Sequence, residues 1–183
     1  MRVKQILVPT DFSEASLEAL KMAVKFIDLY GSTIDLMHVI PLMSYYDESM
    51  EHLGVPFDME KDIYPKVLKE TNKKLHDIAE EFIPKEHRGQ LINLVGRKTA
   101  QVIAEQGNKS QYDMIIMANK GGHETKDMRS NITEKVIRYS EKPVLSLDTA
   151  ISKESVNKIL VPVDGSEESA TPLAAGFDLA MTF

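Results

Sequence analysis

The chain has 183 residues, of which 43 % are hydrophobic and 27 % charged, a balance typical of a folded globular domain. Its formal net charge of −6 and the lack of any Lys/Arg block exclude a partner bound by neutralising nucleic-acid phosphates. The absence of cysteine excludes disulfides and thiolate metal sites. Neither an apolar signal core nor a stretch long enough to span a bilayer is present, which predicts a cytoplasmic protein without a membrane partner.

Short apolar runs predict six β-strands. Most of the runs are uninterrupted and bounded by proline, glycine or polar residues, as in strands buried within a parallel sheet. The run Met114 to Met117 is expected in the interior of the sheet. The predicted strands are Val3–Val8, Ser32–Val39, Gln90–Val95, Tyr112–Ala118, Val144–Leu147 and Lys158–Val163.

Apolar residues at helical spacing predict a helix after most of these strands. Ser13 is a good N-cap for the first helix, and Phe12 and Leu17 are placed to form a hydrophobic staple. Asn131, followed three residues later by Glu134, is an Asn form of the capping box. The predicted helices run from Ser13 to Gly31, from about Tyr64 to Pro84, from Thr99 to about Gly107, from near Asn131 onward, and from Ser166 to Met181.

The connection from Pro41 to about Asp62 is longer than most and rich in large apolar side chains. Such a composition argues against disorder. We expect a flap that covers its own core, with a ligand lid or a subunit contact as the alternatives.

The opening of the chain is repeated near its other end. Residues Val161–Ser169 are identical to Val8–Ser16 at six of nine positions, and the two stretches are 153 residues apart in the sequence. A repeat of this length is the size of a domain, which indicates one module begun twice. We expect a domain over residues 1–148, a linker over 149–156 and a partial second domain over 157–183. Because a lone strand and helix cannot bury their apolar faces, this last segment is expected to pack against a partner subunit.

Strands that alternate with helices favour an α/β fold, an open and doubly wound parallel sheet with helices on both faces. In such sheets ligands bind beyond the C-terminal ends of the strands, where the strand order reverses. The ends of the first, second and fourth strands are therefore expected to surround one crevice. The residues placed there are Pro9, Thr10, Asp11, Val39 and the stretch Ala118, Asn119, Lys120, Gly121 and Gly122.

The composition of this crevice favours nucleotide binding over catalysis. Gly121-Gly122 lets the backbone approach an anion, and the free N–H groups of the helix beginning near Asn131 present positive partial charge to it. Asp11 is expected to accept hydrogen bonds from a base or ribose. The structural alternative is that the Asp and the Gly pair only fix turns, since neither G-x-x-x-x-G-K-[ST] nor G-x-G-x-x-G is present.

Four ordered motifs resemble those of the universal stress protein family over nearly all of residues 1–148, and the repeat makes the chain similar to tandem members with a truncated second domain. The resemblance implies a Rossmann-like, five-stranded sheet in the order 3-2-1-4-5. It also implies a cytoplasmic, non-catalytic stress-response protein that forms a homodimer through its last strand. The motifs are Val8-Pro9-Thr10-Asp11-Phe12-Ser13, Leu36-Met37-His38-Val39, Met114-Ile115-Ile116-Met117-Ala118, and Thr133-Glu134-Lys135-Val136-Ile137-Arg138 leading to Lys142-Pro143-Val144-Leu145.

One branch of that family binds ATP through the first-strand Asp, the Val ending the second strand, and a motif G-x-x-G, nine residues, G-[ST]. The resemblance implies ATP or AMP as the cofactor and no metal beyond a Mg ion held with the nucleotide. The chain departs at Ala118, at the eight-residue spacer after Gly121, and at Ser130-Asn131. Since a side chain at Ser130 fills space that phosphate oxygens need, we expect a retained pocket with weakened or absent triphosphate binding. The candidate nucleotide-binding residues are Pro9, Thr10, Asp11, Val39, Ala118, Asn119, Gly121, Gly122, Ser130, Asn131 and Ile132.

Two other functions are left open. An ATP hydrolase needs metal-holding carboxylates and an activated water, and the glycine loop offers only Glu124 and Asp127. A ligand-free module that dimerises or binds an unknown protein partner is the closer alternative. The five histidines have no zinc-like spacing, so solvent exposure or core packing is expected of each.

Overall fold

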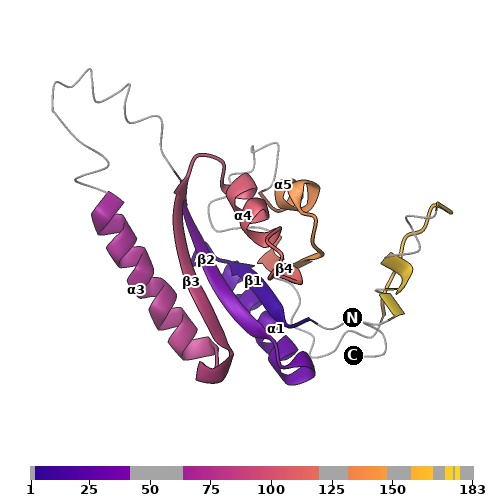
Figure 1. Ribbon diagram of the computed structural model, residues 1–183, viewed down its shortest axis with the longest axis horizontal. Coiled ribbons are helices and arrows are strands. Elements are labelled where there is room, and N and C mark those ends of the chain that lie inside the picture. Colours follow the sequence, from indigo (N-terminus) through magenta and orange to yellow (C-terminus); the bar gives the residue numbers. More distant parts are fainter. Residues whose placement is uncertain are drawn as a thin grey trace, which may run out of the picture.

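The structure, a computed structural model, describes residues 3–41, 64–119, 132–147, 158–166, 172–174 and 176–177. Five parallel strands form one sheet in the order β3-β2-β1-β4-β5 (Figure 1). The predicted fold class and strand order are confirmed, and β4 lies in the interior between β1 and β5. The strands are β1 Gln5–Pro9, β2 Thr33–Pro41, β3 Arg88–Gly96, β4 Met114–Ala118 and β5 Val144–Leu147.

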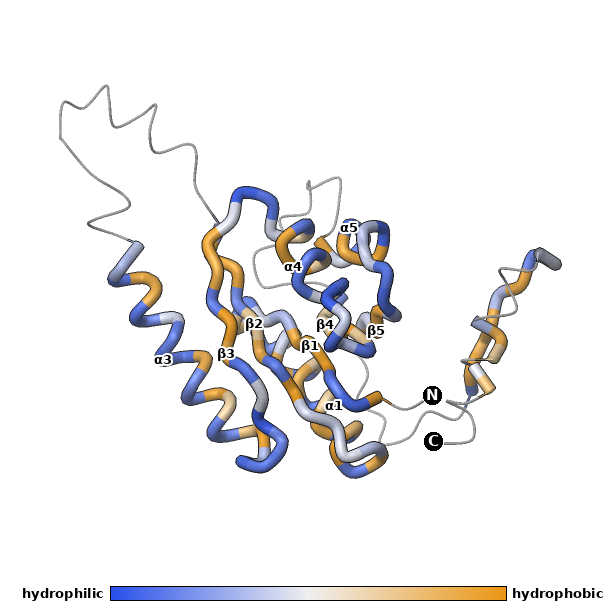
Figure 2. The backbone as a smooth tube through the Cα atoms, viewed as in Figure 1, coloured by the Kyte–Doolittle hydropathy of each residue, from blue (hydrophilic) through white to orange (hydrophobic). Residues whose placement is uncertain are grey.

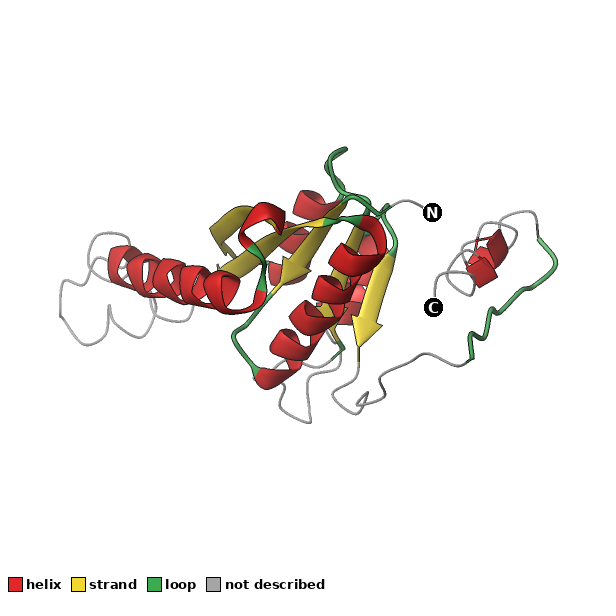
Figure 3. Ribbon diagram, turned by 90° about the horizontal axis from the view of Figure 1, so that it is seen from below, coloured by secondary structure: helices red, strands yellow, loops and turns green. Residues whose placement is uncertain are grey.

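Helices lie on either side of the sheet, as the view turned by 90° shows (Figure 3). The core residues of α1 and α3 cluster on one face, and those of α4 and α5 cluster on the other. No helix in the described ranges is long and apolar enough to cross a membrane. The helices are α1 Glu14–Tyr30, α3 Tyr64–Phe82, α4 Thr99–Gly107 and α5 Ile132–Tyr139, and a 3₁₀ turn over Lys85–His87 precedes β3.

Strand β1 contributes to both halves of the core. Because successive side chains of a strand point to opposite faces, Ile6 and Val8 pack on the α1 side and Leu7 on the α4 side. None of the three has any exposed surface, as expected of a central strand. Along α3, by contrast, hydrophobic and hydrophilic residues alternate (Figure 2), as expected of a helix with one buried face.

The ends of α1 are capped as the sequence predicts. The Ser13 hydroxyl accepts a hydrogen bond from the Ser16 N–H at 3.3 Å. Gly31 ends the helix in the left-handed conformation with φ of 66°, and its N–H donates to the Ile27 carbonyl. This conformation favours glycine because a Cβ would be strained there.

A buried carboxylate fixes the register of three strands at the N-terminal end of the sheet. Asp35 of β2 is 1 % exposed, and its Oδ1 accepts from the Gln5 side chain of β1 at 2.7 Å and from the Gln90 N–H of β3 at 2.8 Å. The β2–β3 register shifts at this point, so Asp35 faces two residues of β3 in a β-bulge. One of them is Gly89, where a Cβ would lie 1.8 Å from Asp35 Oδ1. The bulge therefore requires glycine.

The second oxygen of this carboxylate is bonded to the segment before β4. The Tyr112 hydroxyl donates to Asp35 Oδ2 at 2.7 Å and accepts from the Gln106 amide of α4 at 3.0 Å. Burial, followed by the bond to Asp35, raises the pKa of Tyr112 to about 12. The neutral phenol is therefore the form that the fold stabilises.

A second carboxylate joins β1 to β4. Asp113 Oδ2 accepts the N–H groups of Lys4 and Gln5 at 2.7 and 2.9 Å. The Asp113 N–H in turn donates to the Gln5 carbonyl. Together with the Asp35 contacts, these bonds fix the register of β1 against both of its neighbours.

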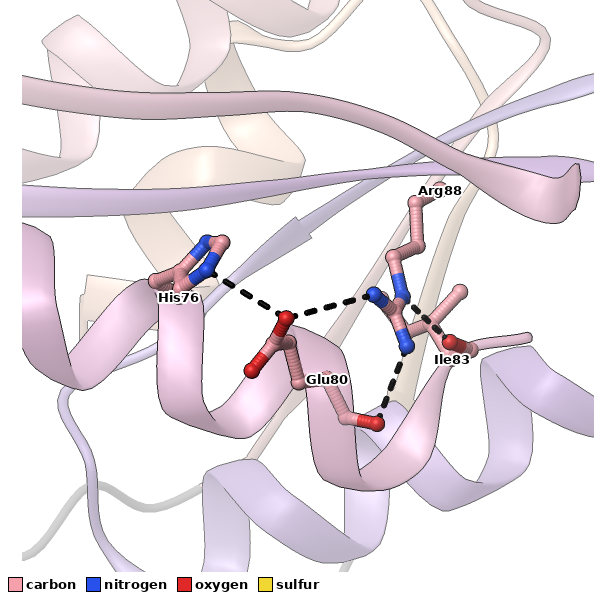
Figure 4. A network of polar contacts seen from close by, with 4 residues as sticks. All are labelled: His76, Glu80, Ile83 and Arg88. Carbon is pink, nitrogen blue, oxygen red and sulfur yellow. Dashed lines mark hydrogen bonds and ion pairs between the residues drawn. The ribbon is translucent and has the colours of Figure 1, made fainter. Parts of the chain in front are cut away.

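Arg88, the first residue of β3, caps the C-terminus of α3 (Figure 4). Its Nε donates to the Ile83 carbonyl at 2.6 Å and its Nη2 to the Glu80 carbonyl at 3.0 Å, where a helix has no partners of its own. The Glu80 carboxylate also lies 3.4 Å from His76 and 4.0 Å from Arg88. Because Glu80 is exposed, these ion pairs contribute little, and the two carbonyl bonds hold the turn into β3.

The prediction of a strand over Lys158–Val163 is wrong. Residues 158–164 have no regular secondary structure, and Leu160 is 93 % exposed, whereas its repeat counterpart Leu7 is fully buried. A strand forms only where a neighbour supplies hydrogen bonds, and local sequence similarity to β1 does not provide one. Residues 172–174 and 176–177 are helical, within the range predicted for the last helix.

Other predictions fall outside the described residues. They concern most of the connection from Pro41 to Asp62, the capping residue Asn131 and the linker over 149–156. The bounds of the confirmed strands differ from the predicted ones by no more than two residues, as is common at element ends.

The raised pKa of Tyr112 predicts a loss of stability at high pH. An unfolded tyrosine ionises near pH 10 and the folded one near 12, so its contribution is complete below pH 10 and is lost as the pH rises to 12. The loss should amount to at most about 3 kcal/mol. In urea unfolding from pH 8 to 12, Tyr112→Phe should lack this part of the decline. The exposed Tyr139→Phe should retain it, and identical pH profiles for all three proteins would contradict the assignment.

Candidate functional site

The strand order reverses between β1 and β4, the position where open α/β sheets bind ligands. From this point α1 follows β1 on one face of the sheet and α5 follows β4 on the other. The pairs Ile6 with Met114 and Leu7 with Ile115 bring the C-terminal ends of the two strands to the same edge. Those ends carry Thr10-Asp11 and Ala118-Asn119.

The turn after β1 is held by a chain of short hydrogen bonds. The Thr10 N–H donates to the Met37 carbonyl at 2.7 Å, and the Thr10 hydroxyl lies 2.9 Å from the Ser16 hydroxyl. That Thr10 oxygen also accepts the Phe12 N–H at 3.0 Å. Asp11 Oδ1 accepts both the N–H and the hydroxyl of Ser13. Asp11 therefore stabilises the turn, as the structural alternative predicts. The same hydrogen bonds hold the Asp11 carboxylate at the end of β1.

An aromatic pair supports the same turn from the α3 side of the sheet. Phe12 has a φ of 66°, a conformation uncommon for a residue with a side chain, and is the only non-glycine residue of the described ranges with a positive φ. Its ring centroid lies 4.4 Å from that of His38 on β2, and Lys74 of α3 lies 5.5 Å from the Phe12 ring. His38 Nδ1 is 2.8 Å from the Thr10 carbonyl and carries the proton, because a carbonyl only accepts.

The start of α5 is anchored to the end of β4. The Thr133 hydroxyl donates to the carbonyls of Ala118 and Asn119 at 2.8 and 3.2 Å, and Thr133 is buried. Asn119 N–H donates to the Leu147 carbonyl of β5 at 2.6 Å. The first turn of α5, where backbone N–H groups have no partner within the helix, is therefore fixed beside the C-terminal end of β4.

The predicted site residues that the structure describes lie at the ends of β1 and β4, on β2 and at the start of α5. Pro9 ends β1 and is followed by Thr10 and Asp11, and Ala118 ends β4 and is followed by Asn119. Val39 is buried in the α4-side core, which leaves mainly its backbone for a ligand, and Ile132 opens α5 with its side chain exposed. The predicted residues outside the described ranges are Gly121, Gly122, Ser130 and Asn131.

Sequence reasoning missed three residues that position this site. They are His38, Ser16 and Thr133, which hold the Thr10 carbonyl, the Thr10 hydroxyl and the end of β4. Each acts through hydrogen bonds that local patterns do not reveal, although the His-Val pair near the end of β2 and a Thr in the first turn of a helix were visible signals. In the described part of the chain, no group of three or more His, Cys, Asp or Glu residues could hold a metal ion.

A family model accounts for most of this chain. Residues 2–147 match the model of the universal stress protein family. The chain belongs to this family. A curated relative, universal stress protein MJ0577 of Methanocaldococcus jannaschii, is 30 % identical over 151 residues, which cover 78 % of this chain and 93 % of the relative. The solved structure of MJ0577 superposes with a TM-score of 0.64 at 28 % identity, covering 81 % of this universal stress protein and 97 % of that chain.

Other solved universal stress proteins share the fold at lower identity. One from Archaeoglobus fulgidus has a TM-score of 0.74 at 19 % identity and covers 99 % of this chain but 63 % of its own. A universal stress protein in complex with cAMP has a TM-score of 0.52 at 16 % identity, covering 82 % of this chain and 100 % of its own. Another from A. fulgidus, in complex with dAMP, has a TM-score of 0.50 at 17 % identity, covering 80 % and 98 %.

Thr133 provides a test of how α5 is anchored. Thr133→Val keeps the shape of the side chain but leaves the two carbonyls without this donor, so unfolding free energy should fall by about 1–2 kcal/mol. Thr133→Ser keeps the hydroxyl and should lose less. Amide exchange in α5 should be faster in the Val variant than in the Ser variant. Equal stability and equal exchange for the two variants would show that the hydroxyl does not anchor the helix.

Proposed function

We propose that this universal stress protein is a non-catalytic stress-response protein of the cytoplasm that binds an adenine nucleotide at the C-terminal ends of β1 and β4. The observation that carries the proposal is the anchoring of α5 by Thr133 beside the end of β4, next to the fixed Asp11 turn of β1. Helix N-termini bind phosphates, and a fixed carboxylate accepts hydrogen bonds from a base or ribose.

The two ends of the proposed site have different roles. At the β4 end, the N–H groups of α5 and the backbone of Gly121 and Gly122 would bind phosphate oxygens. At the β1 end, Asp11 would contact the nucleoside, with Pro9, Thr10 and the Val39 backbone beside it. Ser130, Asn131 and Ile132 would lie at the phosphate end, where a Mg ion would accompany a polyphosphate. The solved relatives with cAMP and dAMP support an adenine nucleotide as the ligand class.

The departures from the ATP-binding motif bear on the phosphate end. Ala118 lies in the core cluster on the α1 side, so its methyl group is accommodated by packing. The departures that weaken triphosphate binding are then the shortened spacer and Ser130. We propose that the nucleoside end is retained and that the protein prefers a nucleotide with few phosphates. Asp11 already serves to hold Ser13, which supports a binding role over catalysis.

Ligand titration tests this function. AMP and cAMP should raise the melting temperature in proportion to the logarithm of ligand concentration, and ATP should raise it less. Phosphate release from ATP should stay at the background rate. Asp11→Ala should lose the nucleotide-induced shift. Asp164→Ala, which removes the matching carboxylate of the repeat, should retain it. A shift by none of the nucleotides would contradict the proposal, and a larger shift with ATP would contradict the weakened phosphate end.

We further propose that residues 157–183 begin a second domain of the same type. The Asp164 carboxylate accepts the N–H and the hydroxyl of Ser166 at 3.0 and 2.7 Å, which repeats the Asp11–Ser13 turn. Gly165 has a φ of 84°, as Phe12 has a positive φ at the equivalent position. Gly176 lies against Val161, just as its counterpart Ala23 shares a core cluster with Val8. The turn after β1 and one contact between β1 and α1 thus have counterparts in this segment.

A protein-interaction function is the second candidate, and the exposed apolar side chains of this segment favour it. Leu160 is 93 % exposed and Phe177 66 %, where their counterparts in β1 and α1 are covered by a domain. β5 lies at the edge of the sheet and offers the other surface for a homodimer. A second copy of the chain, or an unknown protein partner, would bind one of these surfaces and cover its exposed apolar side chains.

Light scattering distinguishes the two dimer surfaces. We expect a dimer at micromolar concentration. The double substitution Leu160→Glu with Phe177→Glu should leave the dimer intact if β5 forms it and should dissociate it if residues 157–183 do. The substituted side chains are exposed, so the melting temperature of the domain should not change. A monomeric wild-type protein would contradict both surfaces.

A further inference from the structure

We infer that His38 is a positioning residue that sets the conformation of the Asp11 turn and thereby the nucleotide affinity of the site. The identity of the ligand, an adenine nucleotide, rests on the proposed function. The positioning of the Asp11 turn by His38 rests on the geometry alone. The backbone of Phe12 is strained, with a φ of 66°. Non-glycine residues held in this region are destabilising and persist only where the surroundings enforce them.

The repeat shows that the turn itself demands a positive φ. At the equivalent position, Gly165 adopts a φ of 84° between an Asp and a Ser that make the same hydrogen bonds. Glycine meets this demand without strain. The first copy has Phe12 instead, so its side chain must offset the cost through contacts that glycine lacks.

Those contacts come from β2 and α3. The Phe12 ring lies against the His38 ring, and Lys74 lies over Phe12. His38 also donates from Nδ1 to the Thr10 carbonyl, the residue immediately before Asp11. One side chain therefore holds the turn at two points, at Thr10 by a hydrogen bond and at Phe12 by ring packing, on either side of Asp11.

The electrostatics of His38 favour its neutral form. Burial lowers its pKa below the ordinary value of 6.5, the bond to Thr10 and the charge of Asp11 oppose that shift, and Lys74 adds to it. Within the described residues, these are the charged groups that act on the ring, and β3 presents the neutral Asn93 at the paired position. A protonated ring would be repelled by Lys74 and would attract Asp11 away from Ser13. Acidification below pH 6.5 is therefore expected to loosen the turn.

Three variants separate positioning from general stability. His38→Phe keeps a ring beside Phe12 but loses the donor to Thr10, and His38→Gln keeps an N–H donor. His87→Phe is the matched control, because His87 Nδ1 makes the same kind of bond, 2.9 Å to the Ser32 carbonyl, at the opposite end of the sheet. His38→Phe should weaken AMP binding about 5-fold, the equivalent of one lost hydrogen bond. His38→Gln should restore most of that loss, and His87→Phe should leave the affinity unchanged.

The turn is also measured without ligand, by amide exchange of Phe12 and Ser13, whose N–H groups donate within it. Exchange of both should accelerate about 5-fold in His38→Phe and stay at the wild-type rate in His87→Phe. If AMP fails to bind the wild-type protein, the proposed function fails, while this measurement still decides the positioning role. Equal exchange in the two Phe variants would overturn it.

A measurement on the wild-type protein does not depend on how the variants fold. The phosphate of cAMP keeps one negative charge between pH 5.5 and 7.5, so the ligand does not titrate. Affinity for cAMP should stay unchanged above pH 6.5 and fall as the pH is lowered below it, and the fall should be absent in His38→Gln. A pH dependence that is the same in both proteins would overturn the role of His38.

Discussion

The sheet depends on the carboxylate of Asp35, which is buried, has no ion pair with any described residue, and holds three strands in register. Its two oxygens accept hydrogen bonds from Gln5 of β1, from Gln90 in the bulge of β3 and from Tyr112 before β4. The three donors come from three different segments of the chain. A slip of one residue in a strand moves every side chain to the other face. Since Asp113 fixes β1 against β4 in the same way, the N-terminal edge of the sheet determines which residues arrive together at the C-terminal edge.

That register is what makes the candidate site. In the register of β1 and β2, Leu7 lies opposite Asp35 and Pro9 opposite Met37. One residue further along each chain, Thr10 and His38 therefore come together, and His38 contacts the Thr10 turn at the C-terminal edge. Because the rise per residue of a strand is nearly constant, the register at one edge of the sheet determines which residues lie side by side at the other edge. The polar network is thus far from the site but sets its geometry.

The fold could be predicted from the sequence because its signals are local. Apolar runs, the Ser13 cap and the Gly31 stop each depend on a few neighbouring residues, and alternating strands and helices leave few topologies. The same reasoning failed for Lys158–Val163, which repeats the sequence of β1 but pairs with no strand of the described sheet. The roles of Asp35, His38 and Thr133 were also missed. Each depends on partners in segments distant along the chain, and their pairing is known only once the register is known.

The two halves of the candidate site are held by different hydrogen bonds. The Asp11 turn depends on Thr10, Ser16 and His38, whereas the start of α5 depends on the hydroxyl of Thr133 and the end of β4. None of these hydrogen bonds joins one half to the other. In the proposed site, these separate hydrogen bonds belong to the nucleoside end and to the phosphate end. The shortened spacer after Gly121 is a change at the proposed phosphate end, whereas the hydrogen bonds of the β1 turn are made by residues of that turn, of α1 and of β2. The same Asp–Ser turn recurs at Asp164, in a segment without a glycine motif of its own.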